Sequence, residues 1–288
     1  MNIELNDVVA VVTGASRGAG KGIAEALGAL GATVYVTGRS KQEGDAPLPG
    51  TIYATAEAID AAGGTGIPVV CDHADDAQVE ALFAQIKRDH GHIDILVNNA
   101  TFLHDELIAK GPFWEKSAAL VDILDVGLRS SYIATRLAAP LMLEQRRGLV
   151  VFTSSFGANC YMHGAAYGAQ KAGTDKFARD MAVDFKPFDV ACVSIWMGML
   201  RTERSRAAMD QAPDAYAGFW EIAETPQFTG QLIAHLYRDP ARMEKTGSVY
   251  IGAELALEYD LKDTDGKQPV SHREMLGAPP EHHPAIVD

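Results

Sequence analysis

Tyr167, Lys171 and Ser154 are the residues whose types and spacing predict acid–base chemistry on a carbonyl. If residues 167–186 form a helix, Tyr167 and Lys171 lie one turn apart on the same face. A neighbouring ammonium lowers the pKa of a phenol, which is ordinarily about 10 and too high for ready proton transfer near neutrality. Ser154 adds a hydroxyl for a substrate oxygen. Such pairs also arise by chance on helices, so the trio indicates a function only beside a cofactor site.

A glycine-rich turn near the start of the chain supplies a candidate for that site. The apolar run 8–12 leads into it, and apolar residues at helical spacing follow from Ile23 to Leu30. This order predicts a strand, a turn and a helix. The N-terminus of such a helix offers free N–H groups and a positive dipole to a pyrophosphate. We therefore predict cofactor contacts at Gly14, Ser16, Arg17, Gly18, Ala19 and Gly20.

Further apolar runs alternate with helix-like segments along the chain, and no linker separates them. Runs of this length, spaced widely enough for helical crossovers, are typical of buried parallel strands. The sequence therefore predicts a single-domain α/β fold, a Rossmann-type doubly wound sheet of seven mostly parallel strands with helices on both faces. The expected strands after the first are 33–37, 67–71, 93–97, 149–153, 190–195 and 248–251.

Together these features resemble the short-chain dehydrogenase/reductase family. The glycine pattern, the triplet 98–100, the serine and the Tyr-x-x-x-Lys pair occur in the family's order and spacing, over about residues 5–255. The resemblance implies reversible hydride transfer between a nicotinamide and a carbonyl or alcohol carbon. It implies that Tyr167 donates the proton, that Lys171 holds the nicotinamide ribose, and that Ser154 rather than Ser155 binds the substrate oxygen. Four segments resemble the dehydrogenase/reductase member 1 group within that family: 32–39, 113–115, 126–129 and 259–263.

The resemblance also extends the expected cofactor site beyond the glycine turn. It implies contacts with the adenine after the third strand, with the ribose and nicotinamide after the fourth, and with the carboxamide after the sixth. Taken alone, His73 reads as an ordinary surface histidine. The implied residues are Asp72, His73, Asn99, Ala100, Gly198, Leu200 and Thr202, together with Tyr167 and Lys171.

Three positions depart from the family's pattern. Thr101 follows the asparagine triplet where glycine is usual, and Met197 stands where proline is usual. Gly127 occupies the position of an asparagine whose backbone carbonyl anchors a water linked to the lysine. A glycine keeps that carbonyl, but in a helix it costs about 1 kcal/mol relative to alanine. Asp125 is not expected to be catalytic.

The end of the second strand favours NADP(H) over NAD(H). In dinucleotide folds an acidic side chain there accepts hydrogen bonds from the adenosine ribose and repels a 2′-phosphate. This sequence has Thr37-Gly38-Arg39 at that place and no carboxylate. Arg39, with Arg17 in the glycine turn, can hold a 2′-phosphate through charge-assisted hydrogen bonds.

Composition excludes several other classes of protein. The formal net charge of −13 argues against general nucleic-acid binding. The three cysteines, Cys71, Cys160 and Cys192, do not have the spacing of a disulfide framework or a zinc site, so no metal is predicted. The chain begins without a signal-peptide pattern and has no apolar run of membrane-spanning length, which indicates a cytoplasmic protein without a membrane partner.

Aromatic and apolar residues surround the expected site and suggest an apolar carbonyl or alcohol as the small-molecule substrate. We expect one domain over residues 1–259, with a substrate lid over about 200–228, and a C-terminal tail over 260–288. The resemblance favours a homodimer or homotetramer. The candidate lining residues are Phe102, Leu103, Phe113, Trp114, Phe156, Tyr161, Met162, Tyr216, Phe219 and Trp220.

Two other functions remain open from the sequence. One is a binding protein that senses NADP(H) without turnover, which the departures at Gly127 and Met197 favour. The other is an isomerase or dehydratase that recycles its hydride internally. The intact Tyr167, Lys171 and Ser154 favour the oxidoreductase.

Overall fold

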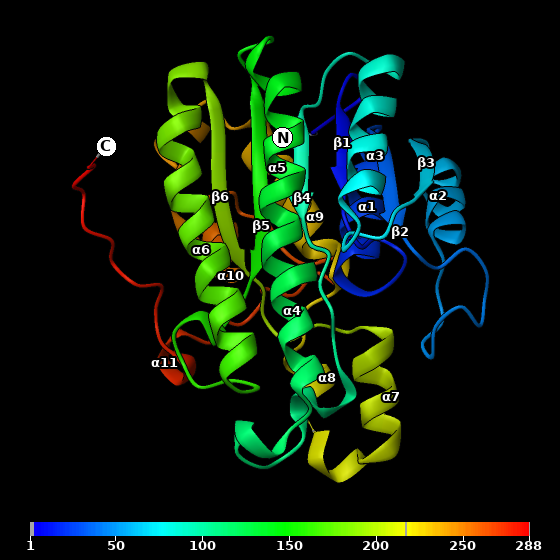
Figure 1. Ribbon diagram of the computed structural model, residues 1–288, viewed down its shortest axis with the longest axis vertical. Helices are drawn as coiled ribbons and strands as arrows, with labels where there is room; N and C mark the ends of the chain where they lie inside the picture. The colour runs from blue at the N-terminus through cyan, green and yellow to red at the C-terminus, as the bar shows by residue number, and fades with distance from the viewer. Residues whose placement is uncertain (1–2, 217, 288) are drawn as a thin grey trace.

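The computed structural model describes residues 3–216 and 218–287. Seven strands, all parallel, form one sheet in the order β3-β2-β1-β4-β5-β6-β7 (Figure 1). The predicted doubly wound α/β fold is confirmed, and the strand boundaries differ from those expected by one or two residues. The strands are β1 Val9–Val12, β2 Thr33–Gly38, β3 Thr65–Val70, β4 Ile95–Asn98, β5 Gly148–Ser154, β6 Val190–Trp196 and β7 Val249–Ile251.

Helices cover both faces of this sheet. One apolar core joins the sheet to α1, α2, α9 and α10, and a second core joins it to α3, α5 and α6. A short α4 continues through a π-helical turn, Asp125–Arg129, into α5. The helices are α1 Gly18–Ala29, α2 Ile52–Ala61, α3 Asp76–Asp89, α4 Asp122–Leu124, α5 Ser130–Leu143, α6 Ala165–Phe185, α7 Glu203–Gln211, α8 Phe219–Ile222, α9 Pro226–Arg238, α10 Gly252–Glu258 and α11 Arg273–Leu276.

The apolar runs form strands because helices bury both faces of the central sheet. In β1, Val9 and Val11 pack into one core while Ala10 and Val12 pack into the other. Successive side chains of a strand point to opposite faces, so a strand covered on both faces is continuously apolar. β3 is the exception to the expectation of buried strands. It pairs only with β2 at the edge of the sheet, and Val70 is 44% exposed.

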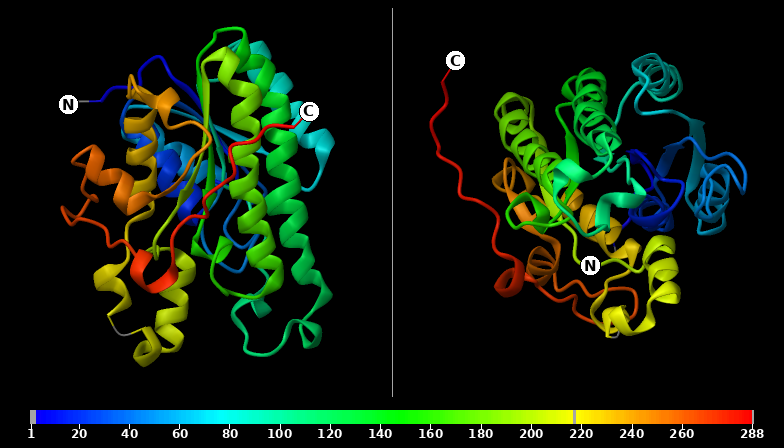
Figure 2. Two further views of the ribbon diagram at one scale, coloured as in Figure 1. Left: turned by 90° about the vertical axis from the view of Figure 1, so that its left-hand side faces the viewer. Right: turned by 60° about the horizontal axis from the view of Figure 1, so that its bottom comes forward.

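The strand order reverses between β1 and β4, because β1 pairs with both β2 and β4. The loops that follow β1, β4, β5 and β6 therefore meet at one edge of the sheet, where doubly wound folds bind their ligands. Figure 2 shows the α7 and α8 segment beyond this edge. This arrangement brings the glycine turn, the asparagine triplet and the serine-tyrosine-lysine residues together.

The segment after residue 260 lies partly against the body of the domain. Asp263 accepts hydrogen bonds from the backbone N–H and the hydroxyl of Thr225, and His272 is 5% exposed. Asn159 donates a hydrogen bond to the carbonyl of Ala278 at 2.9 Å. Figure 2 shows residues 279–287 as an extended stretch outside the helices. The part of the expected tail up to Ala278 therefore covers the body beside β6.

Candidate active site

The glycine turn after β1 is built for close approach of the backbone. Gly14 has a φ of +67°, and a Cβ there would lie 2.8 Å from the backbone of Ala100. A Cβ on Gly20 would lie 2.3 Å from the carbonyl oxygen of Gly14 and 2.4 Å from the amide nitrogen of Asn99. Side chains at these two places would therefore push the turn away from β4 and α1. The expected strand, turn and helix are present.

The asparagine triplet ties the end of β4 to that turn. The Asn99 amide donates to the carbonyl of Thr13 at 2.8 Å and to that of Gly14 at 3.1 Å. The backbone N–H groups of Asn99 and Ala100 both donate to the Thr13 hydroxyl at 2.9 Å. Asn99 thus fixes the geometry of the glycine turn. The contacts with the ribose and nicotinamide that the sequence predicts for Asn99 and Ala100 stay a prediction.

Two arginines, Arg17 and Arg39, lie near the end of β2, as the sequence predicts. The Arg17 guanidinium donates to the Ser40 hydroxyl at 2.8 Å and to the carbonyls of Pro49 and Gly50 at 3.1 and 2.7 Å. It is thereby folded over the loop that follows Arg39. The Arg39 side chain is 67% exposed and lies 3.6 Å from the Asp72 carboxylate. Both guanidinium groups border the same corner of the domain.

His73 is buried rather than a surface histidine. Its Nε2 lies 2.8 Å from the hydroxyl of Thr37 on β2, and its Nδ1 has no partner among the described residues. Burial lowers the pKa of His73 to about 4, so the ring is neutral at physiological pH. It packs behind β2, while Asp72 beside it faces Arg39. Contact of either residue with an adenine stays a prediction.

The loop after β6 carries Gly198, Leu200 and Thr202 to the same edge. Thr202 caps α7, since its hydroxyl accepts a hydrogen bond from the Ser205 N–H at 3.2 Å. The Gly198 N–H donates to the carboxyl group of Glu224 at 3.0 Å. Glu224 is 3% exposed, and burial raises its pKa to about 8. This loop is therefore fixed by a buried acid that sequence reasoning missed.

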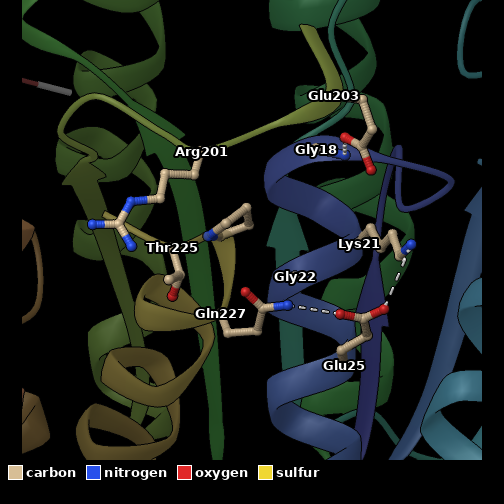
Figure 3. Close-up of a pocket in the computed structure, with 9 residues that line it drawn as sticks. Gly18, Lys21, Gly22, Glu25, Arg201, Glu203, Thr225 and Gln227 are labelled. Atoms are coloured by element: carbon tan, nitrogen blue, oxygen red, sulfur yellow. Dashed lines mark hydrogen bonds and ion pairs between the residues drawn. The ribbon is translucent and has the colours of Figure 1, made fainter. Parts of the chain in front are cut away.

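A carboxylate stands at the N-terminus of α1. Glu203, the first residue of α7, accepts a hydrogen bond from the Gly18 N–H at 2.9 Å. A cavity of about 260 Å³ opens beside this contact, lined by Lys21, Arg201 and Gln227 among others (Figure 3). The N–H that the sequence predicts for a pyrophosphate therefore binds an anionic oxygen in this structure.

The tyrosine and lysine lie as predicted, one turn apart on α6. The Lys171 ammonium lies 5.6 Å from the centroid of the Tyr167 ring and donates to the carbonyl of Thr153 at 3.1 Å. The expected lowering of the Tyr167 pKa is wrong for this structure. Burial raises the pKa of Tyr167, and the hydrogen bond with Ser155 opposes that rise. The reason is that the ammonium points to the end of β5 rather than to the phenolic oxygen.

Ser155, not Ser154, is the serine beside the tyrosine. The Ser155 hydroxyl is hydrogen-bonded to the Tyr167 hydroxyl at 2.8 Å. Ser154 is 0% exposed, and its hydroxyl donates to the carbonyl of Lys171 at 3.4 Å. Adjacent residues of an extended chain point to opposite sides, so only one of the two serines can face the Tyr167 hydroxyl. Ser154 therefore does not lie beside the Tyr167 hydroxyl as expected, and its contact with the substrate oxygen stays a prediction that this geometry does not favour.

Gly127 lies in the π-helical turn and is packed against α6. Its carbonyl accepts hydrogen bonds from the Gln170 amide at 3.0 Å and from the Ser131 hydroxyl at 3.1 Å. A Cβ on Gly127 would lie 3.0 Å from the side chains of Gln170 and Thr101. Gln170, which precedes Lys171, thus fills the space where a larger side chain would stand. No signal in the sequence marked this contact between the π-helical turn and α6.

The aromatic residues expected around the site differ widely in exposure. Phe156 is 2% exposed and packs on Trp196 with ring centroids 5.1 Å apart, so it belongs to the core. Phe113, Trp114 and Tyr161 are 66%, 72% and 85% exposed. No group of residues in the described ranges has the composition of a metal site. None of the helices that the structure describes is long and apolar enough to span a membrane.

Known proteins with similar sequences or structures identify the family to which these features belong. The family profile of the short chain dehydrogenases matches residues 8–213. Human dehydrogenase/reductase SDR family member 1 is 37% identical over 281 residues, which cover 93% of this chain and 86% of the human protein. The 3-oxoacyl-(acyl-carrier-protein) reductase of Escherichia coli is 30% identical over 76% of this chain and 82% of its own length. A solved structure of a Xanthomonas campestris protein assigned as a dehydrogenase has a TM-score of 0.78 and 25% identity, covering 92% of this chain and 94% of its own.

Proposed function

This chain belongs to the short-chain dehydrogenase/reductase family of NAD(P)-dependent oxidoreductases, and we propose that it uses NADP(H) to interconvert an apolar carbonyl compound and its alcohol. The observation that carries the proposal is the hydrogen bond between Ser155 and Tyr167, with the Lys171 ammonium over the tyrosine ring. These groups follow β5, two strands from the glycine turn.

The residues present fit a dinucleotide. The Gly18 N–H already binds an anionic oxygen, that of Glu203, at 2.9 Å. The turn at Gly14 and Gly20 has no room for a Cβ and so brings the backbone close to whatever lies against it. When bound, the nicotinamide supplies the hydride chemistry. The protein then has to bind the phosphates, orient the substrate and move one proton.

Tyr167, Ser155 and Lys171 each have a separate part in that task. In the reducing direction the Tyr167 hydroxyl donates its proton to the substrate oxygen. The Ser155 hydroxyl, 2.8 Å from it, orients the same oxygen and stabilises the negative charge that develops there. The Lys171 ammonium, which lies over the tyrosine ring and donates to the Thr153 carbonyl, would hold the ribose hydroxyls of the cofactor. Ser155 replaces Ser154 in this role.

Turnover separates this function from the two alternatives. Calorimetric titration with NADP(H), followed by a panel of carbonyl compounds monitored at the nicotinamide absorbance, is the test. We expect turnover in the wild type and in Tyr53→Phe, a change in a 43% exposed tyrosine of α2, and none above background in Tyr167→Phe. Binding of NADP(H) without tyrosine-dependent turnover would identify a sensor instead. Product without net consumption of NADPH would identify an isomerase or dehydratase.

Preference for NADP(H) is supported by the two arginines and by the absence of a carboxylate at positions 37–39. A 2′-phosphate placed beside Ser40 would meet the guanidinium groups of Arg17 and Arg39. Replacing both arginines by alanine is expected to weaken the binding of NADPH much more than the binding of NADH. The control is Lys41→Ala, which removes an exposed cation two residues beyond Arg39. Equal losses for both cofactors would refute the assignment.

An apolar substrate is supported by the exposed rings of Phe113 and Trp114, which pack edge to face with centroids 5.3 Å apart. A series of ketones of increasing chain length tests this, and kcat/KM should rise with each methylene.

We also propose a homodimer or homotetramer that uses the outer faces of α5 and α6, where Tyr132 and Val183 are 48% and 42% exposed. Light scattering of the full chain measures the mass, and a monomer would refute that part.

A further inference from the structure

Asp175 is a buried carboxylate one helical turn beyond Lys171 on α6. It is 1% exposed. The Ser194 hydroxyl donates to its Oδ1 at 2.6 Å, and the Trp196 indole N–H donates to its Oδ2 at 2.7 Å. An indole N–H can only donate, and 2.6 Å is a distance typical of a hydroxyl bound to an ionised oxygen. Both oxygens of the buried Asp175 carboxyl group therefore have a hydrogen-bond partner, as an ionised carboxylate requires.

Lys171 needs such a partner. It is 7% exposed, and a charge buried without a counter-charge is costly. The groups shown against its ammonium are one carbonyl, from Thr153 on β5, and one aromatic ring, from Tyr167 on α6. Neither carries a negative charge at neutral pH. Burial lowers the pKa of Lys171 to about 8, and Asp175 is the charge that opposes this effect.

Asp175 is itself held by both strands beneath α6. Ser194 and Trp196 lie on β6, and the hydroxyl of Ser154 at the end of β5 also favours its ionised form. Burial raises the pKa of Asp175, and these donors together with Lys171 oppose the rise. This gives Ser154 a place in the site although it does not face the cleft. It belongs to the hydrogen-bond group around Asp175.

We propose that Asp175 is a positioning residue of the active site, whose carboxylate, buried one turn along α6, keeps the buried Lys171 ammonium cationic at the place where it can bind the cofactor. The proposal rests on the function proposed above for Lys171. Asp175 touches neither the substrate nor the tyrosine hydroxyl, so it acts through the lysine. A carboxylate that merely joined α6 to β6 would stabilise the fold and leave the lysine's titration unchanged.

Titration of Lys171 tests this without any turnover. Lysine labelled with ¹³C at Cε is followed by NMR from pH 6 to 11 in the full chain, and the Lys171 signal is assigned by its loss in Lys171→Arg. In Asp175→Asn, we expect the midpoint to fall by about one unit or more, because an opposite charge nearby favours the charged form. The control is Asp180→Asn, which removes a carboxylate on the exposed side of the same helix, where it pairs with Lys176. In Asp180→Asn we expect the Lys171 midpoint to be the same as in the wild type.

A second variant tests the proposal if Asp175→Asn does not fold. Ser194→Ala removes one donor from the carboxylate and makes its ionised form less favourable, so the Lys171 midpoint should fall in the same direction by a smaller amount. If Lys171 titrates as in the wild type in every folded variant, the proposal is overturned.

The pH profile of turnover gives an independent reading. In Asp175→Asn the alkaline limb of kcat/KM should move to lower pH by the same amount as the lysine midpoint. If the wild type reduces no carbonyl, the proposed function fails while the NMR titration still decides the part played by Asp175. A shifted midpoint with an unshifted limb would overturn the link from Asp175 to the chemistry.

Discussion

The choice between two adjacent serines gives a direct test of the site geometry. Ser155→Ala removes the hydroxyl that lies 2.8 Å from the Tyr167 hydroxyl, and with it the donor expected to bind the substrate oxygen. Removing one such donor commonly costs about 10²–10³ in kcat, or about 3–4 kcal/mol of transition-state stabilisation. Ser154→Ala instead removes a hydroxyl whose single proton serves either the Lys171 carbonyl, at 3.4 Å, or the Asp175 carboxylate. We expect it to cost about 1 kcal/mol of folding stability and no more than several-fold in kcat.

The assay is steady-state reduction of a carbonyl found in the panel, with kcat and KM measured separately for Ser154→Ala, Ser155→Ala and the wild type. Thermal unfolding of each variant separates lost stability from lost catalysis. Calorimetric titration with NADPH checks that both variants still bind the cofactor. A larger loss of kcat in Ser154→Ala than in Ser155→Ala, with both proteins folded, would refute the assignment and restore the serine favoured by sequence spacing.

Three further outcomes follow from the same structure. Glu224, whose pKa is raised to about 8, keeps a proton in the folded state that the unfolded chain releases near pH 4.5, so stability should fall as pH rises through this window. Glu224→Gln should remove that fall, worth several kcal/mol at about 1.4 kcal/mol per pKa unit, and chemical denaturation at pH 5 and pH 8 measures it. Glu203→Ala should strengthen NADP(H) binding about fivefold in calorimetry, since a hydrogen bond of about 1 kcal/mol to Gly18 no longer competes with the cofactor; unchanged affinity would mean that the contact does not compete. Gly20→Ala should weaken binding by more than about tenfold and lower Tm, because its Cβ would lie 2.3 Å from the Gly14 carbonyl.

Local sequence patterns predicted the fold and the approximate site well. The run 8–12 and the glycines after it showed a strand, a turn and a helix, since each depends on residues close together in the chain. The four-residue spacing of Tyr167 and Lys171 was enough to place them on one face of α6. The family followed from the same motifs and is confirmed by the comparisons.

Partners from distant segments were beyond the reach of those patterns. Glu203 meets Gly18 across 185 positions of sequence, and Gln170 meets Gly127 across 43. Nothing in the local composition marks such residues, because their importance comes from burial and from the atom that lies opposite. His73 likewise read as a surface residue until the packing behind β2 was known.

The sequence by itself determined the order of the strands and helices, the glycine turn and the tyrosine-lysine pair, because periodicity and helical spacing are properties of neighbouring residues. Only the tertiary structure decided which serine faces the tyrosine. Ser154 and Ser155 have the same side chain and adjacent positions, and the direction of each is set by the point at which β5 leaves the sheet. It also decided that Lys171 and Asp175 are both buried, because their burial depends on α6 packing over β5 and β6.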